Sequence, residues 1–288
     1  MKYLLLLLCL CSLHARAQQL DSLTHDTLSD VQIRLEGLGQ NMIQSLDEKQ
    51  RLMSGRNFLI TLSRALRIKQ SYYFKFDSVK VMSCIYSPDN RFRIFTWNIV
   101  LADETFHYYG VIQLNPEYIK TIKDTTGLKP FYPLIDRSSQ IKNPLDTTVG
   151  ADFWFGANYY SIVPVNYKKQ TGYTLIGWNG HTKTSNKKVV DFLYFQNNKP
   201  YFGKPVFDLQ KNKPLSRLIY EFSNSATQTL KFVPKKQYLI IEAVVPTRPQ
   251  DYGHPETYLP DGSYDYLMFN SKTGIWEMKG LLRDFNFE

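Results

Sequence analysis

The chain has 288 residues, of which 43% are hydrophobic and 21% are charged, and its formal net charge is +9. This composition is typical of a globular protein and excludes an intrinsically disordered one. A polytopic membrane protein and a disulfide-stabilised scaffold are excluded as well, because the chain has one continuous apolar stretch, near its N-terminus, and only three Cys.

The first 17 residues have the pattern of a secretory signal peptide. Lys2 supplies a positive charge, residues 4–13 form an apolar run too short for a stable membrane anchor, and Ala15-Arg16-Ala17 fits the small-x-small cleavage pattern. A lipoprotein signal fits less well, because no small residues precede Cys9 or Cys11. We therefore expect residues 1–17 to be a signal peptide and the mature protein to be exported, to the periplasm, the outer surface or the extracellular space.

Cleavage after Ala17 would change both the charge and the cysteine content of the protein. Loss of Lys2 and Arg16 lowers the formal net charge from +9 to +7, and Cys84 becomes the sole remaining cysteine. A mature chain with one Cys has no internal disulfide, which is compatible with a bacterial periplasm or cell surface. Cys84 lies in a strand-like run, where a buried, unreactive thiol is expected.

Residues 18–70 are predicted to form a helical N-terminal segment. Apolar residues recur at spacings of three and four, the period of one face of an α-helix, at Val31, Leu35, Leu38, Met42 and Leu46. Ser29 or Asp30 is a candidate cap for the first helix, and residues 53–55 are a candidate break before a second, basic helix. A basic amphipathic helix can lie on a membrane surface, but a helix docked on the domain with a solvated face is favoured.

Residues 71–288 are predicted to form an antiparallel β domain. Strand-like runs at 78–86, 91–100 and 106–114 are separated by short turns, and similar pairs follow at 159–167 with 173–178, 189–196 with 200–202, 230–233 with 237–245, and 264–270 with 274–279. No alternation of strands and helices is present, so a parallel sheet is not expected. The fold class is mainly β, an antiparallel hairpin-built sheet arranged as a sandwich, a barrel or a small propeller. The Pro-containing segment 121–153 is either a long loop or a pair of edge strands.

One polar connection is a candidate binding site. Trp178, Asn179 and His181 lie together between two predicted strands, and a Trp with neighbouring amides can stack on a sugar and hydrogen-bond its hydroxyls. The alternative is a polar loop whose Trp packs against the end of the sheet.

Catalytic motifs are absent from the sequence. No nucleophile elbow, P-loop, dinucleotide-binding loop or local zinc signature is found, and no metal or cofactor is expected. A glycan- or polymer-acting hydrolase would need two carboxylates in one cleft. The candidates for such a pair are Asp191, Glu242, Asp261 and Asp265.

The basic excess bears on the partners of the protein. Most Lys residues of the C-terminal half lie in predicted turns, which indicates solvated tips and disfavours nucleic-acid binding. An exported basic protein meets anionic envelope glycans, lipid headgroups or another envelope protein. No transmembrane span is expected in the mature chain.

Four stretches resemble an uncharacterised family of exported, β-rich bacterial proteins: residues 87–94, 175–180, 185–190 and 260–265. The resemblance covers about residues 74–276 and implies export and a β architecture. It implies nothing about activity, because the family has no assigned activity. The sequence thus favours a non-enzymatic binding or structural role in the cell envelope, with the secreted hydrolase as the alternative.

The export hypothesis makes a direct prediction. N-terminal sequencing of the mature protein should begin at Gln18, because cleavage is expected after Ala17. A cytoplasmic chain that retains Met1 would contradict it.

Overall fold

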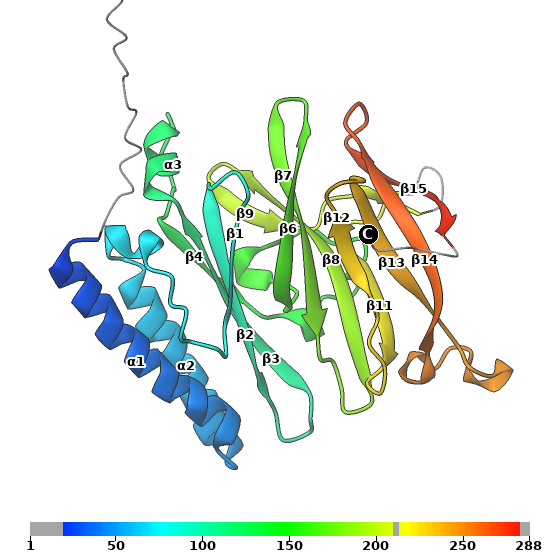
Figure 1. The fold of residues 1–288 in the computed structure, drawn as a ribbon, viewed down its shortest axis with the longest axis horizontal. Helices are drawn as coiled ribbons and strands as arrows, with labels where there is room; N and C mark the ends of the chain where they lie inside the picture. Colours follow the sequence, from blue (N-terminus) through cyan, green and yellow to red (C-terminus); the bar gives the residue numbers. More distant parts are fainter. Residues whose placement is uncertain (1–19, 210–212, 283–288) are drawn as a thin grey trace, which may run out of the picture.

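The structure is a computed structural model that describes residues 20–209 and 213–282, so the predicted signal peptide lies outside the described residues. A pair of helices and three β-sheets are stacked side by side as four layers (Figure 1). An apolar cluster fills each of the three spaces between neighbouring layers. The predicted fold class, a mainly β protein with an N-terminal helical segment, is confirmed.

The helical layer consists of α1 (Ser22–Gln44) and α2 (Glu48–Ala65). The first helix begins earlier than predicted, because Asp21 caps it by accepting a hydrogen bond from the Thr24 backbone N–H at 2.9 Å. The break between the two helices lies at residues 45–47, and the prediction of a break at 53–55 is wrong. Gly55 instead lies inside α2, where a Cβ would come within 2.3 Å of Ile99 in the adjacent sheet. No helix of the described ranges is long and apolar enough to cross a membrane.

The first sheet packs between the helices and the second sheet. It contains β1 (Ser83–Tyr86), β2 (Phe92–Val100), β3 (Phe106–Leu114) and β4 (Phe131–Ile135) in that order, all antiparallel. Because successive side chains of a strand point to opposite faces, Phe95 and Trp97 of β2 contact the helices while Phe92 and Ile94 contact the second sheet. The first predicted strand is shorter than expected and begins only at Ser83.

Arg93 is fully buried on the helix-facing side of the first sheet. Its guanidinium donates to Gln113 Oε1 at 2.8 Å, to the Ser71 carbonyl at 2.6 Å and to the Phe74 carbonyl at 2.7 Å. It also lies 4.6 Å from the centroid of the Phe95 ring. These contacts hold the irregular segment after α2, which includes the short helix η1 (Lys69–Tyr73), against the sheet.

The second sheet is the central β layer. Its strands are β5 (Val149–Gly150), β6 (Asn158–Tyr167), β7 (Gln170–Asn179), β8 (Ser185–Gln196) and β9 (Lys199–Phe202), in the order β5-β9-β8-β7-β6, and β11 (Leu218–Ser223) pairs with β8 beside β9. Of the two alternatives for residues 121–153, the structure shows edge strands: β4 ends the first sheet and β5 ends the second. Pro133 in β4 fits this position, since proline cannot donate to a ladder. The sequence did not predict β11.

The third sheet contains β10 (Phe207–Asp208), β12 (Leu230–Val233), β13 (Tyr238–Val245), β14 (Leu259–Asn270) and β15 (Ile275–Leu282), in the order β10-β15-β14-β13-β12. The expectation of an all-antiparallel region fails at one place, because β10 pairs with β15 in parallel. The chain leaves the second sheet after β9 and enters the third sheet at β10. There β10 forms the edge strand beside β15 and runs parallel to it. The Trp276 indole N–H donates to Thr174 Oγ1 of the second sheet at 2.8 Å and connects the two layers.

An ion pair is buried between the first and second sheets. Arg217 Nε lies 2.8 Å from Asp191 Oδ2, and both side chains have no solvent exposure. Asp191 also accepts the Tyr159 hydroxyl and the Phe192 backbone N–H, while Arg217 Nη1 donates to the Pro144 carbonyl at 2.6 Å. The pair therefore joins β6, β8 and the segment before β11.

Removing one partner of this pair should be far more damaging than removing both. Arg217→Met leaves the Asp191 carboxylate buried without its counter-ion, and we expect a loss of about 3–5 kcal/mol in the free energy of unfolding. The double variant Asp191→Leu/Arg217→Met should lose less than the sum of the single losses. Urea unfolding of the four proteins measures this coupling, and additive losses would contradict it.

Candidate functional site

A groove of about 390 Å³ opens at the end of β7, between the first and second sheets. Its lining residues are Leu101, Thr105, Phe106, His107, Tyr108, Asp136, Ser138, Ser139, Phe155, Asn179, His181, Thr182 and Lys187. They come from the start of β3, the short helix η2 (Ser138–Gln140) with its preceding residues, and the β7–β8 connection. The structure thus places two of the three predicted binding residues, Asn179 and His181, in one groove.

The β7–β8 connection is held in place by hydrogen bonds to other segments. The Gly180 backbone N–H donates to the Tyr108 hydroxyl at 2.6 Å, and Asn179 Nδ2 donates to the Gly156 carbonyl at 2.7 Å. Asn179 Oδ1 accepts the His181 backbone N–H at 2.9 Å, which supports the left-handed conformation of His181 at φ 50°. Asn179 is buried, and both polar atoms of its amide are hydrogen-bonded to the backbone, so its side chain positions His181.

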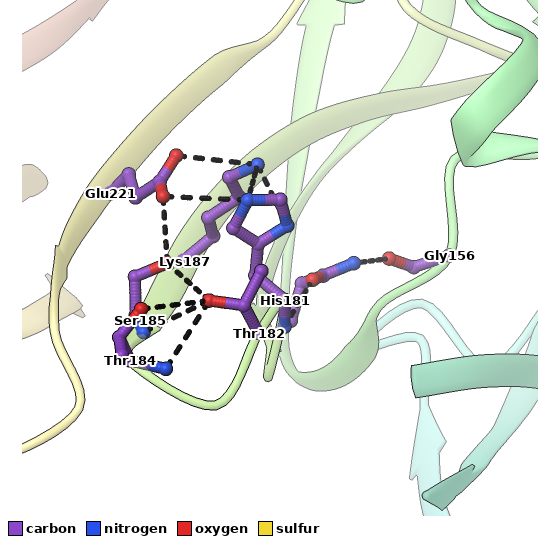
Figure 2. Close-up of polar contacts among 8 residues, drawn as sticks. Gly156, His181, Thr182, Thr184, Ser185, Lys187 and Glu221 are labelled. Carbon is purple, nitrogen blue, oxygen red and sulfur yellow. Dashed lines mark hydrogen bonds and ion pairs between the residues drawn. The ribbon is translucent and has the colours of Figure 1, made fainter. Parts of the chain in front are cut away.

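His181, Lys187 and Glu221 form a polar cluster at the groove. Lys187 Nζ lies 3.0 Å from each ring nitrogen of His181, and His181 Nε2 lies 3.4 Å from Glu221 Oε1 (Figure 2). Glu221 Oε2 lies 3.4 Å from Lys187 Nζ, and its Oε1 accepts the Ser185 hydroxyl at 2.7 Å. Lys187 pairs with Asn179 across one side of β8 and with Glu221 across the other, so the sheet register itself assembles the cluster.

Burial and neighbouring charges determine the protonation of this cluster. Burial lowers the pKa of His181 below its usual value, the Lys187 ammonium lowers it further, and the Glu221 carboxylate opposes both effects. The imidazole is therefore neutral at pH 7 and accepts a hydrogen bond from Lys187. Burial also lowers the pKa of Lys187, while Glu221 favours its charged form.

The opposite wall of the groove carries His107 and Asp136. Asp136 is nearly buried, and its oxygens accept the Tyr108 backbone N–H at 2.9 Å, the Ser138 backbone N–H at 3.0 Å and the Ser138 hydroxyl at 2.6 Å. His107 is 39% exposed, and its Nδ1 lies 3.9 Å from Asp136 Oδ2. Asp136 thus fixes the wall, and His107 presents a polar group to the groove.

Trp178, the third predicted binding residue, lies behind the groove wall. Its indole N–H donates to Asn186 Oδ1 at 3.1 Å, and its ring packs edge-on against Phe106 with the centroids 5.5 Å apart. It is half-buried and is not among the lining residues. Its place supports Phe106, which does line the groove.

The four candidate carboxylates do not meet in one cleft. Asp191 is paired with Arg217, and Asp261 accepts the backbone N–H and hydroxyl of Ser263 within β14, next to the register shift against β13. Glu242 and Asp265 lie on β13 and β14 at neighbouring positions of the register, Glu242 opposite Tyr264 and Asp265 opposite Ile241, so their side chains point to opposite faces of the third sheet. Burial raises the pKa of Asp265, and nearby Asp261 adds to this effect.

Further groups at the site escaped the sequence analysis. In the sequence, Lys187 is one of many basic residues, and Glu221 lies on β11, whose mixed burial lacks the alternation that identifies a strand. Within residues 20–209 and 213–282, no group of three or more His, Cys, Asp or Glu side chains is arranged to hold a metal ion. The single described cysteine, Cys84, is free, and burial raises the pKa of its thiol to about 11.

The chain's own residues carry the functional argument, because neither a protein-family model nor a curated protein sequence matches this chain. The resemblance of four short stretches to an exported family stays a prediction. The functional proposal therefore rests on the groove, on the β7–β8 connection that is hydrogen-bonded to other segments, and on the His181 cluster.

The His181 cluster predicts two opposite changes in one titration. Lys187→Met removes the cation that disfavours the imidazolium and should raise the pKa of His181, whereas Glu221→Gln removes the stabilising carboxylate and should lower it further. An NMR titration of the imidazole resonances measures both shifts, with His254 on another connection as the internal reference. Shifts in the same direction, or none, would contradict the assignment of these contacts.

Proposed function

We propose that the protein is an exported, non-enzymatic binding protein of the cell envelope and that its groove holds a sugar unit of an envelope glycan. The observation that carries the proposal is the mixed lining of the groove, in which aromatic rings lie beside polar side chains from separate segments. Phe106 supplies a half-buried ring, with the buried rings of Tyr108 and Phe155 behind it, and His107, His181 and Lys187 supply the nearby polar groups.

This lining matches the chemistry of a sugar. A pyranose has an apolar face of C–H groups and a rim of hydroxyls, so it suits a site with aromatic rings and a few oriented polar groups. The volume of about 390 Å³ lies near the lower end of small-molecule sites, about 300–1,000 Å³, and suits a small ligand or one end of a chain.

The cell-envelope part of the proposal rests on the N-terminal sequence. The charged start, the apolar run and the Ala15-Arg16-Ala17 pattern favour export, and export brings the protein into contact with glycans. A lipid headgroup and another envelope protein are the competing ligands, and the experiment below distinguishes them.

The alternative function, hydrolysis of a glycan by paired carboxylates, receives less support. The Asp191 carboxylate is buried in an ion pair with Arg217, and the Glu242 and Asp265 side chains point to opposite faces of the third sheet. Inside the groove Asp136 already accepts three hydrogen bonds. An acid–base pair would need two carboxyl groups about 5–9.5 Å apart across the bond that is cleaved.

A glycan array probed with the mature chain tests the proposal. We expect binding to envelope-type oligosaccharides, and His181→Ala should weaken it by about three- to tenfold, the effect of losing one hydrogen bond of about 1 kcal/mol. His254→Ala is the matched control, since it removes an exposed imidazole from a connection of the third sheet.

Three outcomes would contradict the proposal. Equal binding by both His variants, with unchanged melting temperatures, would remove the groove as the site. Binding to lipid vesicles or to a protein, but to no oligosaccharide, would replace the ligand class. Release of reducing ends from a bound polymer, abolished by a carboxylate substitution, would establish an enzyme.

A further inference from the structure

We infer that the groove selects a sugar that carries a carboxylate and that the Lys187 ammonium is the group that recognises it. This inference rests on the proposed function, because it names the chemical class of the ligand of the same groove. The inference depends on the contacts of Lys187 with the rest of the protein, which only partly satisfy its ammonium group.

Lys187 is a half-buried cation at the groove. Its side chain is only 17% exposed, because β8 lies between β7 and β11 at this position. Burial of an ammonium group is costly unless hydrogen bonds and an opposite charge compensate it. The partners of Lys187 therefore decide whether the charge is satisfied within the protein.

The described partners of Lys187 leave its charge under-compensated. An ammonium has three hydrogens to donate, and a neutral imidazole offers one lone pair, at 3.0 Å in His181. Glu221 Oε2 is 3.4 Å away, whereas charge-assisted hydrogen bonds to a carboxylate are about 2.7–2.9 Å long. The other oxygen of Glu221 accepts the Ser185 hydroxyl at 2.7 Å, which holds the carboxylate at that distance. A carboxylate on the ligand would complete the set.

The rest of the groove does not repel an anion. Asp136 is the one acidic residue among those that line it, and its oxygens are covered by three hydrogen bonds from Tyr108 and Ser138. Just outside the lining, Glu104 is neutralised by Lys183 at 2.6 Å. Glu221 is the acidic group nearest Lys187, and its contact of 3.4 Å is longer than a charge-assisted hydrogen bond, so the ammonium retains hydrogens to donate to a ligand carboxylate.

The same charges favour a carboxylate over a phosphate. Among the lining residues Lys187 is the only Lys or Arg, and the imidazole beside it is neutral at pH 7 because burial and Lys187 lower its pKa. A dianionic phosphate is usually held by several cationic or backbone donors. A carboxylate, with one negative charge, needs fewer such donors than a dianionic phosphate does.

Matched pairs of sugars test this inference by calorimetry or on the array. Oligomers of galacturonate and of galactose have the same ring stereochemistry and differ in the carboxylate, so wild-type protein should bind the acidic series about tenfold more tightly. This preference should shrink as salt rises, since a partly exposed ion pair is screened. Galactose 6-phosphate serves as the phosphate probe.

Substitutions at adjacent lysines assign the preference to one side chain. Lys187→Met should abolish the acidic preference, so that the acidic and neutral oligomers bind with equal affinity, and Lys187→Arg should retain the preference. Lys188→Met is the matched control, because Lys188 is the next residue of β8 and its ammonium lies 4.9 Å from the Tyr160 ring instead of at the groove. Wild-type protein saturated with the acidic sugar should also show a raised pKa of His181, because a second carboxylate then lies beside the imidazole.

The outcomes separate this inference from the proposed function. Equal affinity for galacturonate and galactose oligomers would overturn the acidic selection and leave the glycan site intact. A preference lost in Lys188→Met but kept in Lys187→Met, or tighter binding of the phosphosugar, would overturn the assignment. Absence of binding to every oligosaccharide would instead overturn the proposed function.

Discussion

The structure depends on one constraint: the first and second sheets are each covered on both faces (Figure 1). The first sheet lies between the helices and the second sheet, and the second sheet lies between the first and third sheets. A sheet buried in this way has no solvated face for polar residues, so every charged group inside must find partners. Arg93 meets carbonyls and aromatic rings, and Asp191 meets Arg217 at 2.8 Å. These contacts connect segments that are far apart in the sequence.

Because the faces of these sheets are covered, solvent-accessible polar side chains lie at the ends of the strands. The groove forms where β7 ends and its connection to β8 leaves the covered region. Tyr108 of the first sheet and Gly156 before β6 fix this connection through Gly180 and Asn179. The loop of this site is anchored to strands of two layers that are themselves buried, which restricts its motion.

Two ion pairs of β8 show how burial separates structural from functional charge. Asp191 and Arg217 have no exposure and close contact, which is the geometry of a pair that holds strands together. Lys187 and Glu221 are 17% and 23% exposed, and their charged atoms lie 3.4 Å apart. The His181 imidazole contacts both side chains, and Lys187 lines the groove. The second pair retains capacity for a ligand, and the proposals of an envelope glycan and of its carboxylate follow from that difference.

The sequence alone determined the local structure of this protein. Side-chain alternation and turn residues predicted β3 and β12 within their observed bounds, and the turn pair Asn179-Gly180 marked the loop that carries His181. Only the tertiary structure decided which faces were covered, why α2 continues through Gly55, and which lysine among many meets Glu221. Hydrophobic period and turn chemistry act over a few residues and are visible in sequence order. The pairing of β8 with β11 places Lys187 opposite Glu221, 34 positions away, through long-range burial, to which no short pattern of residues corresponds.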